Sequence, residues 1–317
     1  MRAVVTGSEG LLGSAVVSRL SKYYEVVALD ATSAGARTQA VDIRDSARVR
    51  ALLRPGDTVV HLAGVLGKPS NENPVESVDV NGLGTALLLK ECCEAGVARF
   101  VLGSSVAVYG ADHKYGSASL PLTESAPRHL SSDLRIYAAT KLLQEELAVH
   151  AASSSGLQVR VVRLGVVLGY RPTGKGSLPF VSEWTVRADS NMSLDVPQPM
   201  ASLPILSLRR AAEIVALLAE TPMGNGRSVD VYNAGGSPAT LLELASQICV
   251  EIGSGTVRAG EGVQTTLAGL PTRISDEKLI AELCLPPAEL LQDVVRHMVA
   301  EYRRMRESSD PNEATRT

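Results

Sequence analysis

Thr6-Gly7-Ser8-Glu9-Gly10-Leu11-Leu12-Gly13 is the stretch of this chain that decides its fold. An apolar, β-branched run at residues 2–6 precedes it and is typical of a buried parallel strand. The amphipathic spacing over residues 11–20 predicts a helix directly after it. A strand, a glycine-rich turn and a helix form a cradle for a dinucleotide pyrophosphate, because glycines admit a close backbone approach and the helix N-terminus offers free N–H groups. The Gly7, Gly10, Gly13 spacing matches the usual fingerprint only loosely, so a plain tight turn is the alternative on the glycines alone.

A second predicted strand, at residues 25–30, ends in an acid. Asp30 lies close to the position, roughly 20 residues beyond the glycines, at which a carboxylate binds the adenosine ribose. A carboxylate accepts hydrogen bonds from the 2′-hydroxyl and repels a 2′-phosphate, which favours NAD over NADP as the cofactor. The alternative is a solvated acid at the end of a strand.

Tyr137-Ala138-Ala139-Thr140-Lys141 is the second informative stretch. A helix is predicted over about 134–151, and the i,i+4 spacing places Tyr137 and Lys141 on one of its faces. A phenol with a pKa near ~10 is a weak base at neutral pH, and a nearby ammonium favours its phenolate form. Ser104 and Ser105 follow another predicted strand, at the end where open α/β sheets bind ligands. These residues predict redox chemistry on an alcohol or ketone; a core tyrosine beside an exposed lysine is the alternative.

The motifs resemble those of the extended short-chain dehydrogenase/reductase family, in its NAD-dependent sugar epimerase/dehydratase branch, from residue 1 to about 305. The matching segments are the glycine turn, Val41-Asp42-Ile43-Arg44-Asp45, Val60-His61-Leu62-Ala63-Gly64, Asn81-Gly82-Leu83-Gly84-Thr85 and Ser104-Ser105-Val106-Ala107-Val108-Tyr109-Gly110. The resemblance implies that Ser105, Tyr137 and Lys141 are the catalytic residues. It also implies a set of cofactor-binding residues, namely Gly7, Gly10, Leu11, Leu12, Gly13, Asp30, Asp42, Ile43, Leu62, Ala63, Gly64, Asn81, Ser104, Tyr137 and Lys141.

Three departures from the family pattern narrow the function. The 4,6-dehydratases of the family carry Asp-Glu after the catalytic serine or threonine, where this chain has Val106 and Ala107, so expulsion of water is not expected. Val166 replaces an asparagine that helps to position the diphosphate in sugar-nucleotide enzymes, and Arg209 stands where the family has an aspartate. The last two changes favour a substrate outside the standard sugar nucleotides.

Composition sets further limits on the function. The chain has 317 residues, 45% of them hydrophobic, which is ample for a core, and a formal net charge of −3. It shows no basic stripe, so nucleic acid is not an expected partner. No apolar run is long enough to span a membrane, and a first strand at residue 2 leads us to expect no signal peptide. Four cysteines (Cys92, Cys93, Cys249, Cys284) lack metal spacing and a disulfide pattern, so we expect reduced thiols, a cytoplasmic protein and no metal site.

Alternating strands and helices over residues 1–165 predict an α/β fold, a Rossmann-type doubly wound parallel sheet. We expect residues 203–234 to return to this NAD-binding domain. Residues 166–202, with several prolines and glycines, and 235–305, mainly helical, are expected to form a smaller substrate-binding domain, and 306–317 a disordered tail. The substrate candidates are Ser105, Val106, Arg171 and Lys175; for the two cations, solvated loop charges are the alternative.

The first functional hypothesis is an NAD-dependent epimerase of a sugar, in particular a nucleotide-linked one. Tyr137 removes the hydroxyl proton, hydride passes to the nicotinamide, and the transient ketone takes hydride back on its other face. Ser105 orients the oxygen and Lys141 tunes Tyr137. The second hypothesis is an NAD-dependent dehydrogenase or reductase of a sugar acid, hydroxy acid or biosynthetic ketone; the third is a non-catalytic NAD-sensing or scaffold protein. The resemblance also implies a homodimer, in which predicted helices at 74–96 and 134–151 pair as a four-helix bundle.

Overall fold

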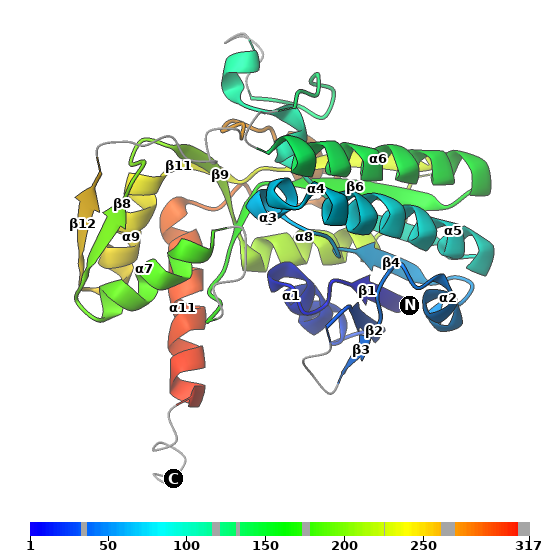
Figure 1. Cartoon of the computed structure of the whole chain (residues 1–317), viewed down its shortest axis with the longest axis horizontal. Helices are drawn as coiled ribbons and strands as arrows, with labels where there is room; N and C mark the ends of the chain where they lie inside the picture. Colours follow the sequence, from blue (N-terminus) through cyan, green and yellow to red (C-terminus); the bar gives the residue numbers. More distant parts are fainter. Residues whose placement is uncertain are drawn as a thin grey trace.

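Seven strands form the central sheet of the structure, a computed structural model (Figure 1). The structure describes residues 1–32, 37–115, 121–130, 134–172, 178–224, 226–260 and 270–309. The strands are β1 (Arg2–Thr6), β2 (Glu25–Asp30), β3 (Thr38–Ala40), β4 (Thr58–His61), β5 (Arg99–Ser105), β6 (Gln158–Leu164) and β10 (Val229–Ala234). Their order is β10-β6-β5-β4-β1-β2-β3, and every neighbouring pair is parallel. The predicted doubly wound α/β fold is therefore confirmed.

Both faces of this sheet are covered by helices. Ala3 and Val5 belong to an apolar layer with α1 (Leu11–Leu20) and α8 (Leu208–Glu220). Val4, which points the other way, belongs to a layer with α2 (Ser46–Leu52), α5 (Thr85–Ala95) and α6 (Arg135–Ser155). In Figure 1, α5 and α6 run side by side. Burial of both faces explains why the strands read as continuous apolar runs rather than as alternating ones.

The helix predicted over 74–96 consists of three segments. It comprises α4 (Pro74–Ser77), a π-helical segment at Val78–Gly84, and α5. A short helix, α3 (Gly67–Glu72), precedes it. Because π-helical turns are rare and frequently occur at functional sites, the segment that carries Asn81 is of particular interest.

A smaller unit adjoins the main sheet and has its own apolar cluster. It contains the three-stranded sheet β11 (Ser237–Thr240), β9 (Ser202–Ser207), β7 (Val166–Leu168), and the pair β12 (Thr256–Ala259), β8 (Ser193–Val196). Its helices are α7 (Pro179–Asp189), α9 (Leu241–Ile252) and α11 (Leu291–Ser309), while α10 (Glu277–Leu283) packs on β10. Figure 1 shows this unit at the left, on the far side of the molecule from α2 and α5. Among the helices of the described residues, none has both the length and the apolar character that a membrane crossing requires.

Two predictions about the later part of the chain are wrong. Residues 203–207 do not return to the main sheet, because β9 pairs with β7 and β11; the return begins with α8, which packs on the main sheet, and is completed by β10. An apolar run reports burial but not which sheet buries it. Residues 306–309, predicted to belong to a disordered tail, are helical, since α11 continues to Ser309. Arg306 pairs there with Asp189 of α7, and a cation also suits the last turn of a helix. Residues 310–317 lie outside the described residues.

Candidate active site

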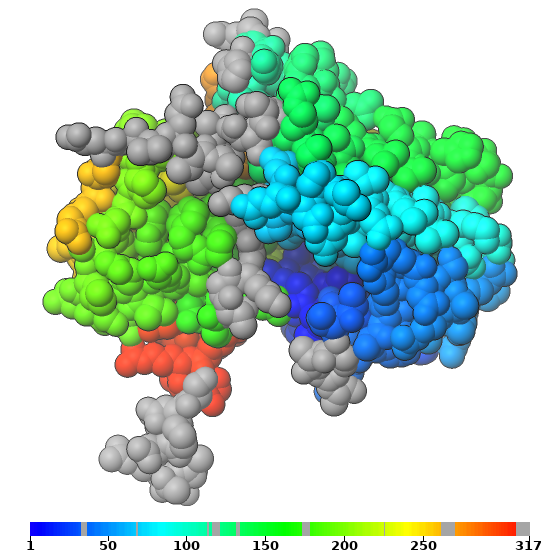
Figure 2. Space-filling view, in the orientation of Figure 1, coloured from blue at the N-terminus to red at the C-terminus, as the bar shows by residue number. Residues whose placement is uncertain are grey.

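The glycine turn lies where the strand order reverses, between β1 and β4. Gly7 has a φ of +71°, and a Cβ on it would lie 2.6 Å from the backbone nitrogen of Ala63. A Cβ on Gly13 would lie 2.0 Å from the carbonyl oxygen of Gly7. Only glycine allows the turn, α1 and the loop after β4 to approach this closely. In Figure 2 the dark-blue N-terminal segment lies at the floor of a recess beside the cyan segment. The geometry of this cradle fits a pyrophosphate at the N-terminus of α1.

The predicted adenosine-binding carboxylates lie close to this turn and to β3. The Asp30 carboxylate accepts hydrogen bonds from the backbone N–H groups of Glu9, at 3.0 Å, and Thr32, at 3.1 Å. It therefore sits against the glycine turn, as a ribose-binding acid would. Arg44 donates side-chain hydrogen bonds to Asp42 and so lowers the pKa of the Asp42 carboxyl. Both positions fit the roles that the resemblance implies.

The loop of Leu62, Ala63 and Gly64 is held in place by Asn81. The Asn81 side chain accepts from Val65 N–H at 2.7 Å and donates to the Val65 carbonyl at 3.0 Å and to Thr140 Oγ1 at 3.1 Å. A Cβ on Gly64 would lie 2.8 Å from Asn81 Oδ1, so glycine is needed there. Asn81 is fully buried, and its side chain joins the cradle loop to α6. Its direct contact with the cofactor stays a prediction.

The structure brings Ser105, Tyr137 and Lys141 together. Ser105 ends β5, and its hydroxyl lies near enough to the Tyr137 phenol on α6 to lower the pKa of that phenol. Ser105 Oγ also accepts from Ala107 N–H at 3.2 Å, which leaves its proton for the phenol or a substrate oxygen. Lys141 Nζ lies 5.9 Å from the centroid of the Tyr137 ring and donates to the Gly103 carbonyl at 2.9 Å.

Burial moves the pKa values of the phenol and the ammonium in opposite directions. Burial raises the pKa of Tyr137 to about 12, and the nearby Ser105 hydroxyl opposes this. Burial lowers the pKa of Lys141 to about 8, and the negative charge of Glu145 opposes this. In the protein alone, Tyr137 is thus a neutral phenol at pH 7, and it needs additional positive charge nearby to become a base.

His61 lies beneath the site as part of a buried polar chain. Its Nδ1 is 2.8 Å from Thr6 Oγ1 and its Nε2 is 2.9 Å from Thr85 Oγ1. Burial, together with the charge of Lys141, lowers the pKa of His61 to about 3, so the ring is neutral at pH 7. His61 therefore joins β1, β4 and α5 as a structural residue. Within the described part of the chain, no group of three or more His, Cys, Asp or Glu residues could hold a metal ion.

The substrate candidates are only partly placed. Val106 is 1% exposed and packs in an apolar cluster with Tyr109. Arg171 lines a cavity of about 410 Å³ between α1 and α11, and none of the three catalytic candidates lines it. Lys175 lies outside the described residues. The structure thus gives no contact between Arg171 and the catalytic candidates.

Sequence reasoning missed Glu145, which is buried and connected to the residues around the site. It accepts from Ser104 Oγ and forms an ion pair with Arg163. Its signal in the sequence is its spacing, since it lies four residues after Lys141 on the same helix face. A charged residue at that spacing usually faces solvent, so the pattern alone does not single it out.

Comparison with known proteins gives both a family and a set of relatives. The family model described as "NAD dependent epimerase/dehydratase family" matches residues 3–199. The UDP-glucose 4-epimerase of Azospirillum brasilense is 30% identical over 187 residues, which are 55% of this chain and 51% of that protein. The enzyme of the same name from Lactobacillus helveticus is 31% identical over 187 residues, covering 55% of this chain and 54% of that protein. The chain spans about half the length of these curated relatives.

Solved structures resemble the chain over almost its whole length. A UDP-glucose 4-epimerase from Thermus thermophilus, solved as a complex with NAD, has a TM-score of 0.78 and 26% identity, covering 96% of this chain and 99% of that one. A partial consensus L-threonine 3-dehydrogenase shares the fold, with a TM-score of 0.80, 18% identity, and coverage of 95% and 99%. The same fold therefore carries both epimerases and a net dehydrogenase.

Proposed function

Because the chain belongs to the NAD-dependent epimerase/dehydratase family, we propose that it is an epimerase of a sugar, in particular a nucleotide-linked one, that works through a transient ketone. NAD, the cofactor of this family, is the one predicted from Asp30. The observation that carries the proposal is the convergence of Ser105, Tyr137 and Lys141 at the carboxyl end of β5.

Each of the three residues has a task that its surroundings support. The Tyr137 hydroxyl exchanges a proton with the substrate hydroxyl, and Ser105, which lies near the phenol, orients the same oxygen. Lys141, buried below the ring, favours the phenolate by its positive charge. When bound, oxidised NAD would supply reversible hydride exchange and a further positive charge.

Val106 and Ala107, which follow Ser105, argue against a dehydratase. They are 1% and 0% exposed and carry no group that could protonate a leaving hydroxyl. The resembling 4,6-dehydratases use Asp-Glu at these two positions. Between the activities named by the family description, epimerisation is thus the better supported.

A second candidate, a net dehydrogenase or reductase of a sugar acid, hydroxy acid or biosynthetic ketone, is favoured by Val166 and Arg209. Val166 is 6% exposed and packs in the apolar cluster of the smaller unit, so it offers no hydrogen bond to a diphosphate. Arg209 NH1 lies 3.4 Å from His297 Nε2 of α11. Both positions differ from those of enzymes that use standard sugar nucleotides.

The test of the proposed function is turnover of a panel of nucleotide sugars by wild type, Tyr137→Phe and Tyr23→Phe. We expect epimerisation of at least one compound by wild type and its loss in Tyr137→Phe, which should still bind NAD. Tyr23 is 70% exposed and serves as the matched control, with wild-type activity expected. Full activity of Tyr137→Phe would refute the assignment, and NAD-dependent oxidation without epimerisation would favour the second candidate.

We also propose that the chain forms a homodimer through the face made by α4, the π-helical segment and α6. Large apolar side chains are exposed there: Val75 is 79%, Val78 53%, Leu83 50% and Leu143 42% exposed. Val75→Asp together with Leu83→Asp should convert a dimer to a monomer in light scattering. Val250→Asp, at an equally exposed site on α9, should not. A wild-type monomer at micromolar concentration would contradict this proposal.

A further inference from the structure

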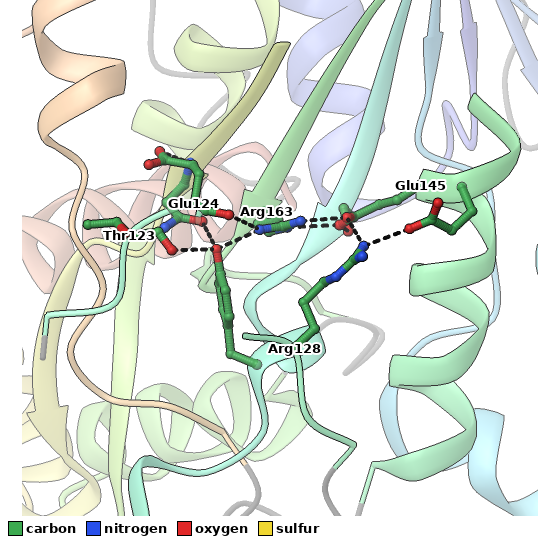
Figure 3. A network of polar contacts seen from close by, with 9 residues as sticks. Thr123, Glu124, Arg128, Glu145 and Arg163 are labelled. Carbon is green, nitrogen blue, oxygen red and sulfur yellow. Dashed lines mark hydrogen bonds and ion pairs between the residues drawn. The ribbon is translucent and has the colours of Figure 1, made fainter. Parts of the chain in front are cut away.

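A buried polar network lies beside the middle of α6, the helix that carries Tyr137 and Lys141 (Figure 3). Glu145 and Arg163 form its centre, with side chains 3% and 5% exposed. Arg163 Nε lies 3.0 Å from Glu145 Oε1 and its NH2 lies 2.7 Å from Oε2, a two-pronged contact. Arg163 NH1 also donates to Tyr109 OH at 2.7 Å and to the Glu124 carbonyl at 3.2 Å. The carboxylate is therefore fixed in place by a residue of β6 that is itself held on its other side.

Glu145 completes a set of three contacts between α6 and the end of β5. The Tyr137 phenol lies near Ser105, which lowers its pKa, and Lys141 donates to the Gly103 carbonyl at 2.9 Å. Ser104, which lies between Gly103 and Ser105 in β5, donates a hydrogen bond from its hydroxyl to Glu145 Oε1 at 2.5 Å. Residues spaced by four on the helix thus meet three consecutive residues of the strand. A slip of the helix along the strand would break all three contacts at once.

Glu145 also lies one helical turn after Lys141 on α6, four residues further along the chain. On α6, the groups around Lys141 are Tyr137 and Glu145. Two cations pair with the carboxylate of Glu145: Arg163 of β6, and Arg128, whose NH1 lies 3.7 Å from Oε2. From β4, His61 faces it as a neutral ring. Lys141 is 3% exposed, so burial disfavours its ammonium, and the charge of Glu145 opposes that effect.

We propose that Glu145 is a positioning residue for the catalytic site, which holds α6 in register with β5 and places a negative charge one helical turn from Lys141. This inference rests on the proposed function for its consequence, because a neutral Lys141 would no longer favour the phenolate of Tyr137. It does not rest on the identity of the substrate. Two substitutions of Glu145 separate the effect of its charge on Lys141 from its effect on the position of α6.

The first substitution, Glu145→Gln, removes the charge and keeps the shape. The protonation of Lys141 can be followed by NMR on protein with labelled lysine side chains; the chain has seven lysines, and Lys141→Arg identifies the signal. We expect the Lys141 transition to fall by about one pH unit, at the lower end of the effect of a close opposite charge. Glu146→Gln is the matched control, since Glu146 is 60% exposed and pairs with Arg128. It should leave the transition unchanged; an unmoved transition in Glu145→Gln, or an equal shift in Glu146→Gln, overturns the charge role.

The second substitution, Glu145→Asp, keeps the charge and shortens the reach to Ser104 and Arg163. The Lys141 transition should stay within about 0.3 unit of wild type, while kcat falls at least tenfold with little change in KM. An unchanged kcat overturns the positioning role, and does so even where Glu145→Gln does not fold. Because the Lys141 titration needs no substrate, failure of the proposed function leaves this measurement valid. Conversely, a wild-type titration in Glu145→Gln leaves the Tyr137→Phe test of the function untouched.

Discussion

Replacement of Gly13 by alanine tests the cradle, because one methyl group there has opposite local and tertiary effects. Gly13 lies in the first turn of α1, where alanine is favoured over glycine by about 1 kcal/mol of helix propensity. The added Cβ, however, would lie 2.0 Å from the Gly7 carbonyl oxygen and 2.8 Å from the Gly7 carbonyl carbon. Both are backbone atoms, so the turn itself has to move.

The steric term should exceed the gain in propensity. Overpacking of a close-packed site costs about 1–3 kcal/mol. Because the clash is with backbone atoms, we place the cost at the upper end and expect a net loss of about 2 kcal/mol in the free energy of unfolding. For a chain of 317 residues, that lowers Tm by roughly 3 °C. The shifted turn also no longer presents its N–H groups to the pyrophosphate in the correct positions, so NAD should bind more weakly. In wild type, NAD at ~100 times its Kd should stabilise the folded chain by ~2.7 kcal/mol. The same NAD concentration should stabilise Gly13→Ala by less.

The assay is thermal unfolding with and without NAD, together with the NAD Kd from calorimetry. Gly224→Ala is the control, because a Cβ there meets nothing within 4 Å and φ is not positive. It should change neither Tm nor Kd. A Gly13→Ala protein that is as stable as wild type and binds NAD with the same Kd would refute the packing argument.

The buried ionisable groups give three more predictions. Because the pKa of Lys141 is about 8 in the folded chain and ~10.4 in the unfolded chain, the unfolded chain holds more protons between these values. Across that range the free energy of unfolding of wild type should rise with pH, by up to about 3 kcal/mol relative to that of Lys141→Met. If urea unfolding gave the same difference between the two proteins at every pH, this prediction would be contradicted. The pKa of His61 is about 3 in the folded chain, so the free energy of unfolding should fall as pH drops from ~6.5 towards 3. His61→Gln should reduce that loss of stability between pH 7 and 4. An equal loss in wild type and His61→Gln would count against this explanation. Glu145→Gln leaves Arg163 buried and unpaired and should cost about 3–5 kcal/mol in urea unfolding, against less than about 0.5 kcal/mol for Glu146→Gln; equal costs would exclude a special role for the buried pair.

The sheet and the convergence of the candidate residues could be predicted because they depend on local patterns. The glycine turn needs close backbone approach, and the sequence marks this with Gly7 and Gly13. The spacing of Tyr137 and Lys141 gives a shared helix face without knowledge of the tertiary structure. Ser105 needed only a strand end, since the carboxyl ends of parallel strands meet at one edge.

Other features depend on contacts between distant segments and could not be read from the chain. Leu203 and Ile205 of β9 are as apolar as the residues of a strand in the central sheet. Only the pairing of β9 with β7 shows that they belong to another sheet. Glu145 reads as a surface helix residue until Arg163 of β6 and Ser104 of β5 are placed against it. Burial, which sets the pKa values of Tyr137 and Lys141, is likewise a property of the folded chain.

The most direct test of the proposed epimerase is to identify the cofactor that purified protein retains. The protein is passed through gel filtration and denatured, and the released compound is measured by absorbance and mass. An epimerase recycles its cofactor in place, so we predict close to one NAD per chain. A chain that emerges empty but binds NAD reversibly would contradict the epimerase and favour the dehydrogenase, and retained NADP would contradict the role given to Asp30.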